Sequence, residues 1–177
     1  MPSITRCALP AGALLRTYVA KGAYADCFAA DIASNASLPA YVEAFYTSTA
    51  FKLERFVLTW AVAKPSSDAD ARRLAHGESE KFAAWTVEAR TPDQLLVCDF
   101  LSRTRSWLMI APIENGGTRL YFGTAVVPVG VGAGRRRLGF PFNTLLGFHQ
   151  LYARILLGAA RGRLIKQTKT AELALRR

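Results

Sequence analysis

The chain has 177 residues, a formal net charge of +10 and a 51% share of hydrophobic residues. That length suits a single domain, which can bury about 70% of its unfolded surface without a disulfide or metal staple. Three cysteines and two histidines, without a CxxC pair, argue against a disulfide framework and against a structural zinc site. We expect no metal and no cofactor.

The positive charge is concentrated in the last quarter of the chain. Residues 135–177 contain ten Lys or Arg and one acid, whereas residues 1–134 contain thirteen basic and twelve acidic residues. We expect a solvated basic helix face and tail, with an anionic partner as the alternative. Weak contact with an anionic membrane would use Arg135, Arg136 and Arg137. Nucleic acid is disfavoured because the aromatic residues nearby lie on the apolar stripe of a predicted helix.

The first 22 residues are predicted to be an irregular or partly paired lead-in. Pro10 and Gly12 interrupt the apolar run after Arg6, which argues against a secretory signal. The longest uncharged run, residues 138–153, is too short and too polar to cross a membrane. We therefore expect a cytoplasmic protein.

Residues 24–32, YADCFAADI, predict the first strand. Ser37 is a plausible N-cap, with Pro39 in the first helical turn. Helical spacing then follows in Leu38, Tyr41, Val42, Phe45, Tyr46 and Thr49. After a break at 47–49, a second helical stripe is carried by Leu53, Phe56, Val57 and Trp60. The polar stretch 66–77 predicts one short turn capped by Asp68.

Residues 82–126 predict four consecutive antiparallel strands, for a sheet of about five strands in all. The three turns lie at 91–94, around 103–104 and at 115–117, where Gly116 and Gly117 permit a tight turn. Pairing Arg90 with Leu95, Leu101 with Ser106 and Ile113 with Thr118 gathers the large apolar side chains on one face. That face would carry Trp85, Val87, Leu96, Cys98, Phe100, Trp107, Met109, Ala111, Leu120, Phe122 and Val126. A face this apolar requires a cover of helices.

The last helix is predicted from Phe140 to about Leu164, with residues 166–177 extending it or fraying. The three glycines at 130, 132 and 134 precede it. Arg135 occupies the place of the third glycine of a dinucleotide fingerprint, so we interpret this stretch as a flexible connector. As a hypothesis, it gates the mouth of a pocket.

The order of these elements resembles the START-like, or SRPBCC, superfamily, and is most similar to bacterial members of unknown function. The resemblance spans residues 24–164. It is carried by residues 24–26 with Phe28, by Trp85 in the first hairpin, by residues 116–120, and by the apolar helix after the Gly/Arg loop. It implies an α+β helix-grip fold. In that fold a curved antiparallel sheet wraps a long C-terminal helix, and two short helices follow the first strand. The expected organisation is a lead-in at 1–22, one helix-grip domain at 23–165 and a basic tail at 166–177.

The resemblance implies a binder of apolar or amphipathic small molecules, lipids among them, held between the sheet and the last helix. The expected lining consists of Trp85, Cys98, Phe100, Trp107, Met109, Phe122, Thr124, His149 and Tyr152.

Two alternatives stay open. A cyclase- or hydrolase-type enzyme in the same pocket would use His149 as its general base, with Tyr152, because histidine titrates near neutrality. A protein with a closed core would act instead through its basic C-terminal surface.

Overall fold

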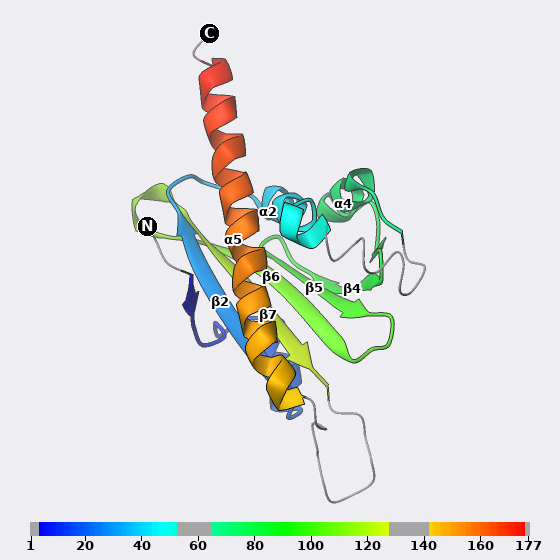
Figure 1. Cartoon of the computed structure of the whole chain (residues 1–177). Helices are drawn as coiled ribbons and strands as arrows, with labels where there is room; N and C mark the ends of the chain where they lie inside the picture. Colours follow the sequence, from blue (N-terminus) through cyan, green and yellow to red (C-terminus); the bar gives the residue numbers. More distant parts are fainter. Residues whose placement is uncertain (1–3, 53–64, 128–141, 176–177) are drawn as a thin grey trace, which may run out of the picture.

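A computed structural model describes residues 4–52, 65–127 and 142–175 of the chain. It is an α+β structure with a curved seven-stranded antiparallel sheet in the order β1-β2-β7-β6-β5-β4-β3 (Figure 1). The strands are β1 (Thr5–Arg6), β2 (Tyr24–Ile32), β3 (Lys81–Phe82), β4 (Trp85–Arg90), β5 (Gln94–Asp99), β6 (Thr104–Pro112) and β7 (Thr118–Val126). The helices are α1 (Arg16–Ala20), α2 (Leu38–Tyr46), α4 (Asp68–Ala75), α5 (Phe142–Leu175) and the 3-10 turn η1 (Glu114–Gly116).

The expectation of about five strands was too low. The additional strands, β1 and β3, are two residues long and occupy the two edges of the sheet. Such short strands leave no alternation pattern in a sequence. The predicted first strand is confirmed with the same bounds, and it pairs with β7 from Tyr24 opposite Val126 to Ile32 opposite Thr118.

Helices α2, α4 and α5 lie on one face of the sheet, which we call the inner face (Figure 1). Ser37 caps α2 by accepting a hydrogen bond from Ala40 N, and the helix ends at Tyr46. Thr47 and Ser48 form a turn and a bend after it, which confirms the break expected here. Residues 49–52 are helical again, but the predicted second stripe, Leu53, Phe56, Val57 and Trp60, lies outside the described residues.

The short turn predicted in the polar stretch is an eight-residue helix, α4. Ser67, rather than Asp68, is its N-cap. The Ser67 side chain accepts from Asp70 N, and the Asp70 carboxylate accepts from Ser67 N, which forms a capping box. The two reciprocal hydrogen bonds at its N-terminus stabilise a helix whose polar composition did not predict one.

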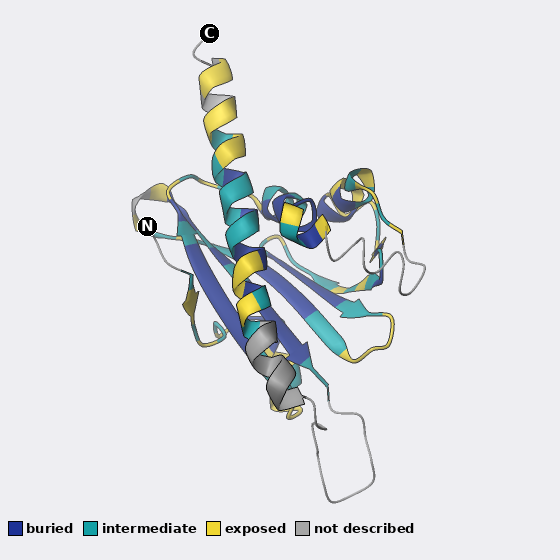
Figure 2. Cartoon of the chain, viewed as in Figure 1, coloured by how far each residue is buried: buried dark blue, intermediate teal, exposed yellow. Residues whose placement is uncertain are grey.

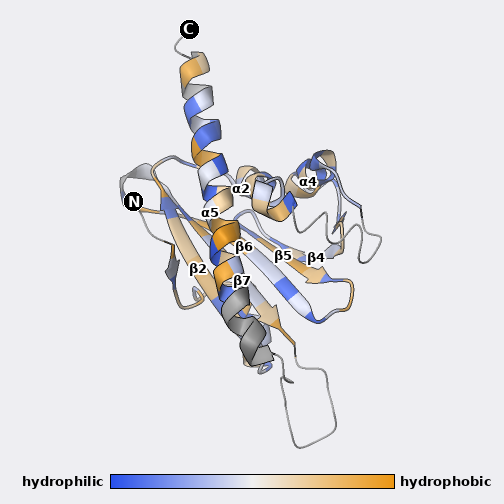
Figure 3. Ribbon diagram, viewed as in Figure 1, coloured by the Kyte–Doolittle hydropathy of each residue, from blue (hydrophilic) through white to orange (hydrophobic). Residues whose placement is uncertain are grey.

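The long helix α5 lies against β2, β7 and α2. It continues past the predicted end near Leu164 as far as Leu175, so residues 166–175 prolong it. These last turns extend beyond the sheet and are mostly exposed (Figures 1 and 2). The strands consist largely of hydrophobic residues, whereas polar and hydrophobic residues are interspersed in the C-terminal half of α5 (Figure 3). The glycine connector and Arg135, Arg136 and Arg137 lie outside the described residues.

The predicted register was correct at one turn and wrong at the other two. Arg90 lies opposite Leu95, but an irregularity between Val87 and Ala89 places Trp85 opposite Asp99. In the β5–β6 hairpin, Phe100 and Leu101 belong to the turn, so Cys98 lies opposite Arg105 and not opposite Met109. The difference is four residues, an even number, so each side chain stays on the same face relative to its partner strand.

The β6–β7 pairing differs from the prediction by a single residue. Pro112, rather than Ile113, lies opposite Thr118, because five residues form the connection and Ile113 N donates to the Gly117 carbonyl. A shift of one residue exchanges the two faces of a strand. Phe122 therefore lies on the inner face with Leu108, whereas Trp107 and Met109 lie on the outer face.

The lead-in covers the outer face of the sheet. Leu15 and Trp107 are fully buried there, together with Ala13, Cys27, Leu96 and Ala125. Gln94 holds the segment in place. Its Nε2 donates to the Gly12 carbonyl at 3.0 Å, while its Oε1 accepts from Leu14 N and Trp107 Nε1, each at 2.9 Å. The part of the sheet around Leu96, Trp107 and Ala125 is thus buried on both faces.

This cover generates a prediction at Gly123. A Cβ added there would lie 2.8 Å from the Asp26 carbonyl oxygen and 3.1 Å from Leu15 Cδ2. Gly123→Ala should therefore lower the free energy of unfolding by about 1–3 kcal/mol, measured by urea denaturation.

Gly12→Ala is the matched control, because an added Cβ at Gly12 meets no atom within 4 Å. It should change the free energy of unfolding by less than about 0.5 kcal/mol. Equal effects at the two glycines would contradict the tight packing of the lead-in against the sheet.

Candidate functional site

A cavity of about 280 Å³ lies between the inner face of the sheet, α2 and α5, and it is partly open to solvent. Its lining is mostly apolar and comes from segments far apart in the sequence. The lining residues are Phe45, Phe51, Ala84, Trp85, Asp99, Phe100, Thr104, Ser106, Phe122, Thr124, Tyr152, Ala153 and Leu156.

Packed phenyl rings form the floor of the cavity. The Phe45 and Phe122 ring centroids are 4.8 Å apart, and those of Phe45 and Phe51 are 5.8 Å apart. Each of these three residues is almost fully buried. The wall on the α5 side consists of Tyr152, Ala153 and Leu156, so an apolar ligand would contact α5 as well as the phenyl rings.

Two buried polar residues of the cavity come from the neighbouring strands β6 and β7. Ser106 and Thr124 lie opposite each other on the inner face, and both are buried. Thr124 Oγ1 donates to Asp26 Oδ1 at 2.7 Å, which fixes its rotamer. The Ser106 hydroxyl makes no hydrogen bond within the part of the chain that the structure describes, so it is available to a ligand.

Asp99 lies at the mouth and organises the turn beside it. Its Oδ1 accepts from Arg103 N at 2.7 Å and from Thr104 N at 3.1 Å. The turn includes Ser102 with a φ of 56° and half-exposed Phe100, which lines the cavity. The carboxylate thus holds the turn that carries Phe100.

Five of the nine predicted lining residues line this cavity: Trp85, Phe100, Phe122, Thr124 and Tyr152. The structure does not bring Trp107, Met109 or Cys98 to it. All three lie on the outer face, the first two because of the β6–β7 register. His149 belongs to α5, but its side chain lies outside the described residues.

Phe45, Phe51 and Ser106 also line the cavity, although the sequence patterns did not predict them there. Phe45 was recognised only as part of an amphipathic helix, because helical periodicity gives the buried face and not what that face meets. Ser106 shares the alternation of Leu108 and Thr104 along β6, and a correct register would have placed it inward.

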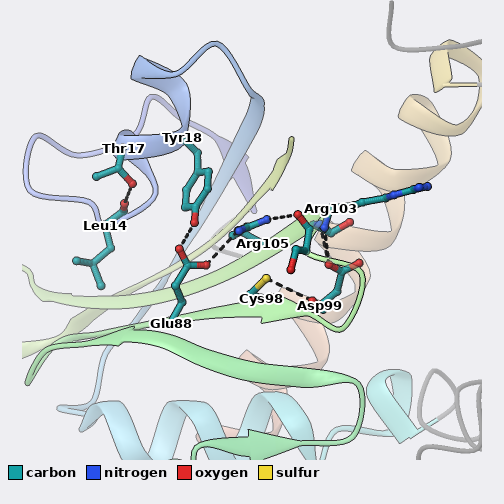
Figure 4. Close-up of polar contacts among 10 residues, drawn as sticks. Leu14, Thr17, Tyr18, Glu88, Cys98, Asp99, Arg103 and Arg105 are labelled. Carbon is teal, nitrogen blue, oxygen red and sulfur yellow. Dashed lines mark hydrogen bonds and ion pairs between the residues drawn. The ribbon is translucent and has the colours of Figure 1, made fainter. Parts of the chain in front are cut away.

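A separate polar cluster lies on the outer face between α1 and β4 (Figure 4). The Tyr18 hydroxyl donates to Glu88, and Arg105 Nε bonds Glu88 Oε2 at 3.1 Å. The Arg105 guanidinium lies 4.5 Å from the centroid of the Tyr18 ring. Glu88 sits at the irregularity in β4, so this cluster ties the bulge to the lead-in.

An ion pair joins β2 and β7 on the outer face, near the end of the two strands away from Thr124. Arg119 binds Asp31 through two hydrogen bonds of 2.7 and 2.8 Å, and Arg161 of α5 donates to the Asp31 carbonyl at 2.9 Å. The hydrogen bond from Arg119 lowers the pKa of the Asp31 carboxyl below its usual value of 3.8. The contacts join β2, β7 and α5 beside a second hollow of about 510 Å³.

Within the described ranges, no three His, Cys, Asp or Glu side chains gather in a way that could hold a metal ion. Among the helices in those ranges, none combines the length and the hydropathy that crossing a bilayer requires. Comparison of the chain with protein-family models, with curated proteins and with solved structures gives no match in any of the three.

Asp99→Ala should destabilise the turn at the cavity mouth. It removes the acceptor of two backbone hydrogen bonds, so we expect the free energy of unfolding to fall by about 1–2 kcal/mol in urea denaturation. Asp99→Asn keeps an acceptor oxygen and should lose less than half as much. Equal losses would show that the hydrogen bonds do not hold the turn.

The Asp31 pair should make stability depend on pH. Because the folded pKa of Asp31 lies below 3.8, its contribution is present above about pH 4 and disappears as the pH falls through the folded pKa. Both side chains are more than a third exposed, so we expect less than about 1 kcal/mol at neutral pH.

The measurement is the free energy of unfolding of the wild type and of Asp31→Asn, obtained by urea denaturation at a series of pH values from neutral downward. The difference should narrow below about pH 4 and shrink in high salt. If the difference in free energy of unfolding between the two proteins stays constant with pH, the substitution acts through packing and not through the charge of Asp31.

Proposed function

We propose that this protein binds an apolar or amphipathic small molecule in the cavity between the inner face of the sheet, α2 and α5. The proposal rests on the cavity itself, which has a floor of phenyl rings and the Ser106 hydroxyl in its lining. Binding sites for small molecules are typically concave and apolar, with a few polar groups that orient the ligand.

The dimensions and lining of the cavity narrow the class of ligand. A volume of about 280 Å³ is at the lower limit of the usual range of about 300–1,000 Å³, which favours a compact ring system over a long acyl chain. The mostly apolar lining disfavours a charged ligand, because burial of an unpaired charge is costly. We therefore expect an uncharged ligand whose polar end reaches Ser106.

We also propose that the fold is a helix-grip fold of the START-like kind. Support comes from the antiparallel sheet, from the neighbouring positions of β2 and β7, and from the packing of α5 against both strands. A cavity between α5 and the sheet is where such a fold would hold its ligand.

The test fills the cavity from α5. Ala153 is buried and lines the cavity, so Ala153→Leu places three extra carbons in the space of the ligand. We expect the affinity for N-phenyl-1-naphthylamine, an uncharged apolar fluorescent probe, to fall at least tenfold, or about 1.4 kcal/mol. Fluorescence titration gives the affinity.

Ala174→Leu is the matched control, because it makes the same change at an exposed position of the same helix. It should leave probe binding unchanged. Ser106→Val, on a central strand, provides a second way to fill the cavity if Ala153→Leu unfolds the chain. Equal probe affinity in the wild type and in both folded cavity variants would overturn the proposal.

A further inference from the structure

Two of the three cysteines meet at the edge of the sheet. β1 pairs with β2 so that Thr5 lies opposite Ala29 and Arg6 opposite Phe28, which places Cys7 opposite Cys27. Cys7 N donates to the Cys27 carbonyl at 3.0 Å. The two Sγ atoms are 3.4 Å apart, and both thiols are free.

This geometry suits a covalent bond. Residues directly opposite each other in an antiparallel pair have Cα atoms about 4.5–5.5 Å apart, which falls within the 4.4–6.8 Å span that disulfides require. Bonding would bring the sulfur atoms from 3.4 Å to about 2.05 Å, a change that side-chain rotation can supply.

The two thiols differ in their access to solvent. Cys27 is 2% exposed, whereas Cys7 is partly exposed. Both residues line an open groove of about 830 Å³. Arg6 and Arg16 line the same groove. Burial, followed by the contact with Cys7, raises the pKa of the Cys27 thiol, which makes Cys7 the first thiol to react.

We propose that Cys7 and Cys27 form a reversible disulfide that staples the lead-in to the edge of the sheet, with a low-molecular-weight disulfide as the oxidant. The Cys7 thiolate attacks one sulfur of the oxidant, forms a mixed disulfide and releases one thiolate. Cys27 then loses its proton and attacks Cys7 Sγ, which closes the internal bond and releases the second thiol. Two protein thiols are oxidised and one small disulfide is reduced to two thiols.

The disulfide would restrain the lead-in, the segment that covers the outer face. Residues 7–15 of the lead-in pack near Trp107 and Gly123 on the outer face. They follow β1, a strand of two residues at the edge of the sheet. A bond at Cys7 closes a loop that contains this whole cover and removes conformational freedom from the unfolded chain. Cys98 lies elsewhere, opposite Arg105 on β6, and is not part of the pair.

The experiment uses the full chain, incubated folded with oxidised glutathione or with dithiothreitol. The oxidised sample should lose two alkylatable thiols and retain the third. Its mass should fall by two hydrogens, with a linked Cys7–Cys27 peptide after digestion. Its midpoint of thermal unfolding should rise by about 6–12 °C, and dithiothreitol should reverse all three changes.

Cys98→Ala is the control and should behave like the wild type, whereas Cys7→Ser should show neither the linked peptide nor the shift. Because Cys7 is partly exposed, Cys7→Ser should fold even if substitution of buried Cys27 does not. A stable glutathione adduct at Cys7, or a linkage through Cys98, would overturn the proposal.

Discussion

The connection between β6 and β7 decides which side chains face α5. Residues 113–117 form it, with Gly116 at a φ of 79° and Gly117 against β2. A Cβ on Gly117 would lie 2.5 Å from the Ile32 carbonyl oxygen, so only glycine fits without moving β2 or the turn. This turn sets Pro112 opposite Thr118, and every residue of the central pair follows from that register.

A sheet with apolar residues on both faces needs other segments packed against each face to exclude water. Within the described residues, the inner face is covered by α2, α4 and α5 and the outer face by the lead-in. Two hydrogen bonds of Gln94 hold the lead-in, and a third binds Trp107. The amide of Gln94 satisfies buried polar groups of the lead-in and of Trp107 at once, and such groups are costly when unpaired. The lead-in is therefore part of the hydrophobic core.

Strand β2 connects the proposed binding cavity with the proposed disulfide. Asp26 points inward and accepts hydrogen bonds from Thr124, which lines the cavity. The next residue, Cys27, points outward to Cys7. Because successive side chains of a strand alternate between faces, the two sites share one stretch of backbone while their side chains never meet.

Local patterns in the sequence determined the bounds of β2, the start of α2 at Ser37, the pairing of Arg90 with Leu95 and the presence of a long apolar helix at the end. Each depends on periodicity or capping within a few residues. Only the tertiary structure decided the face of Trp107 and Met109, the contribution of Phe45, Phe51 and Ser106 to the cavity, and the meeting of Cys7 with Cys27. These features depend on register and on contacts between distant segments, where a one-residue change in a turn exchanges the faces of a strand and leaves its local pattern intact.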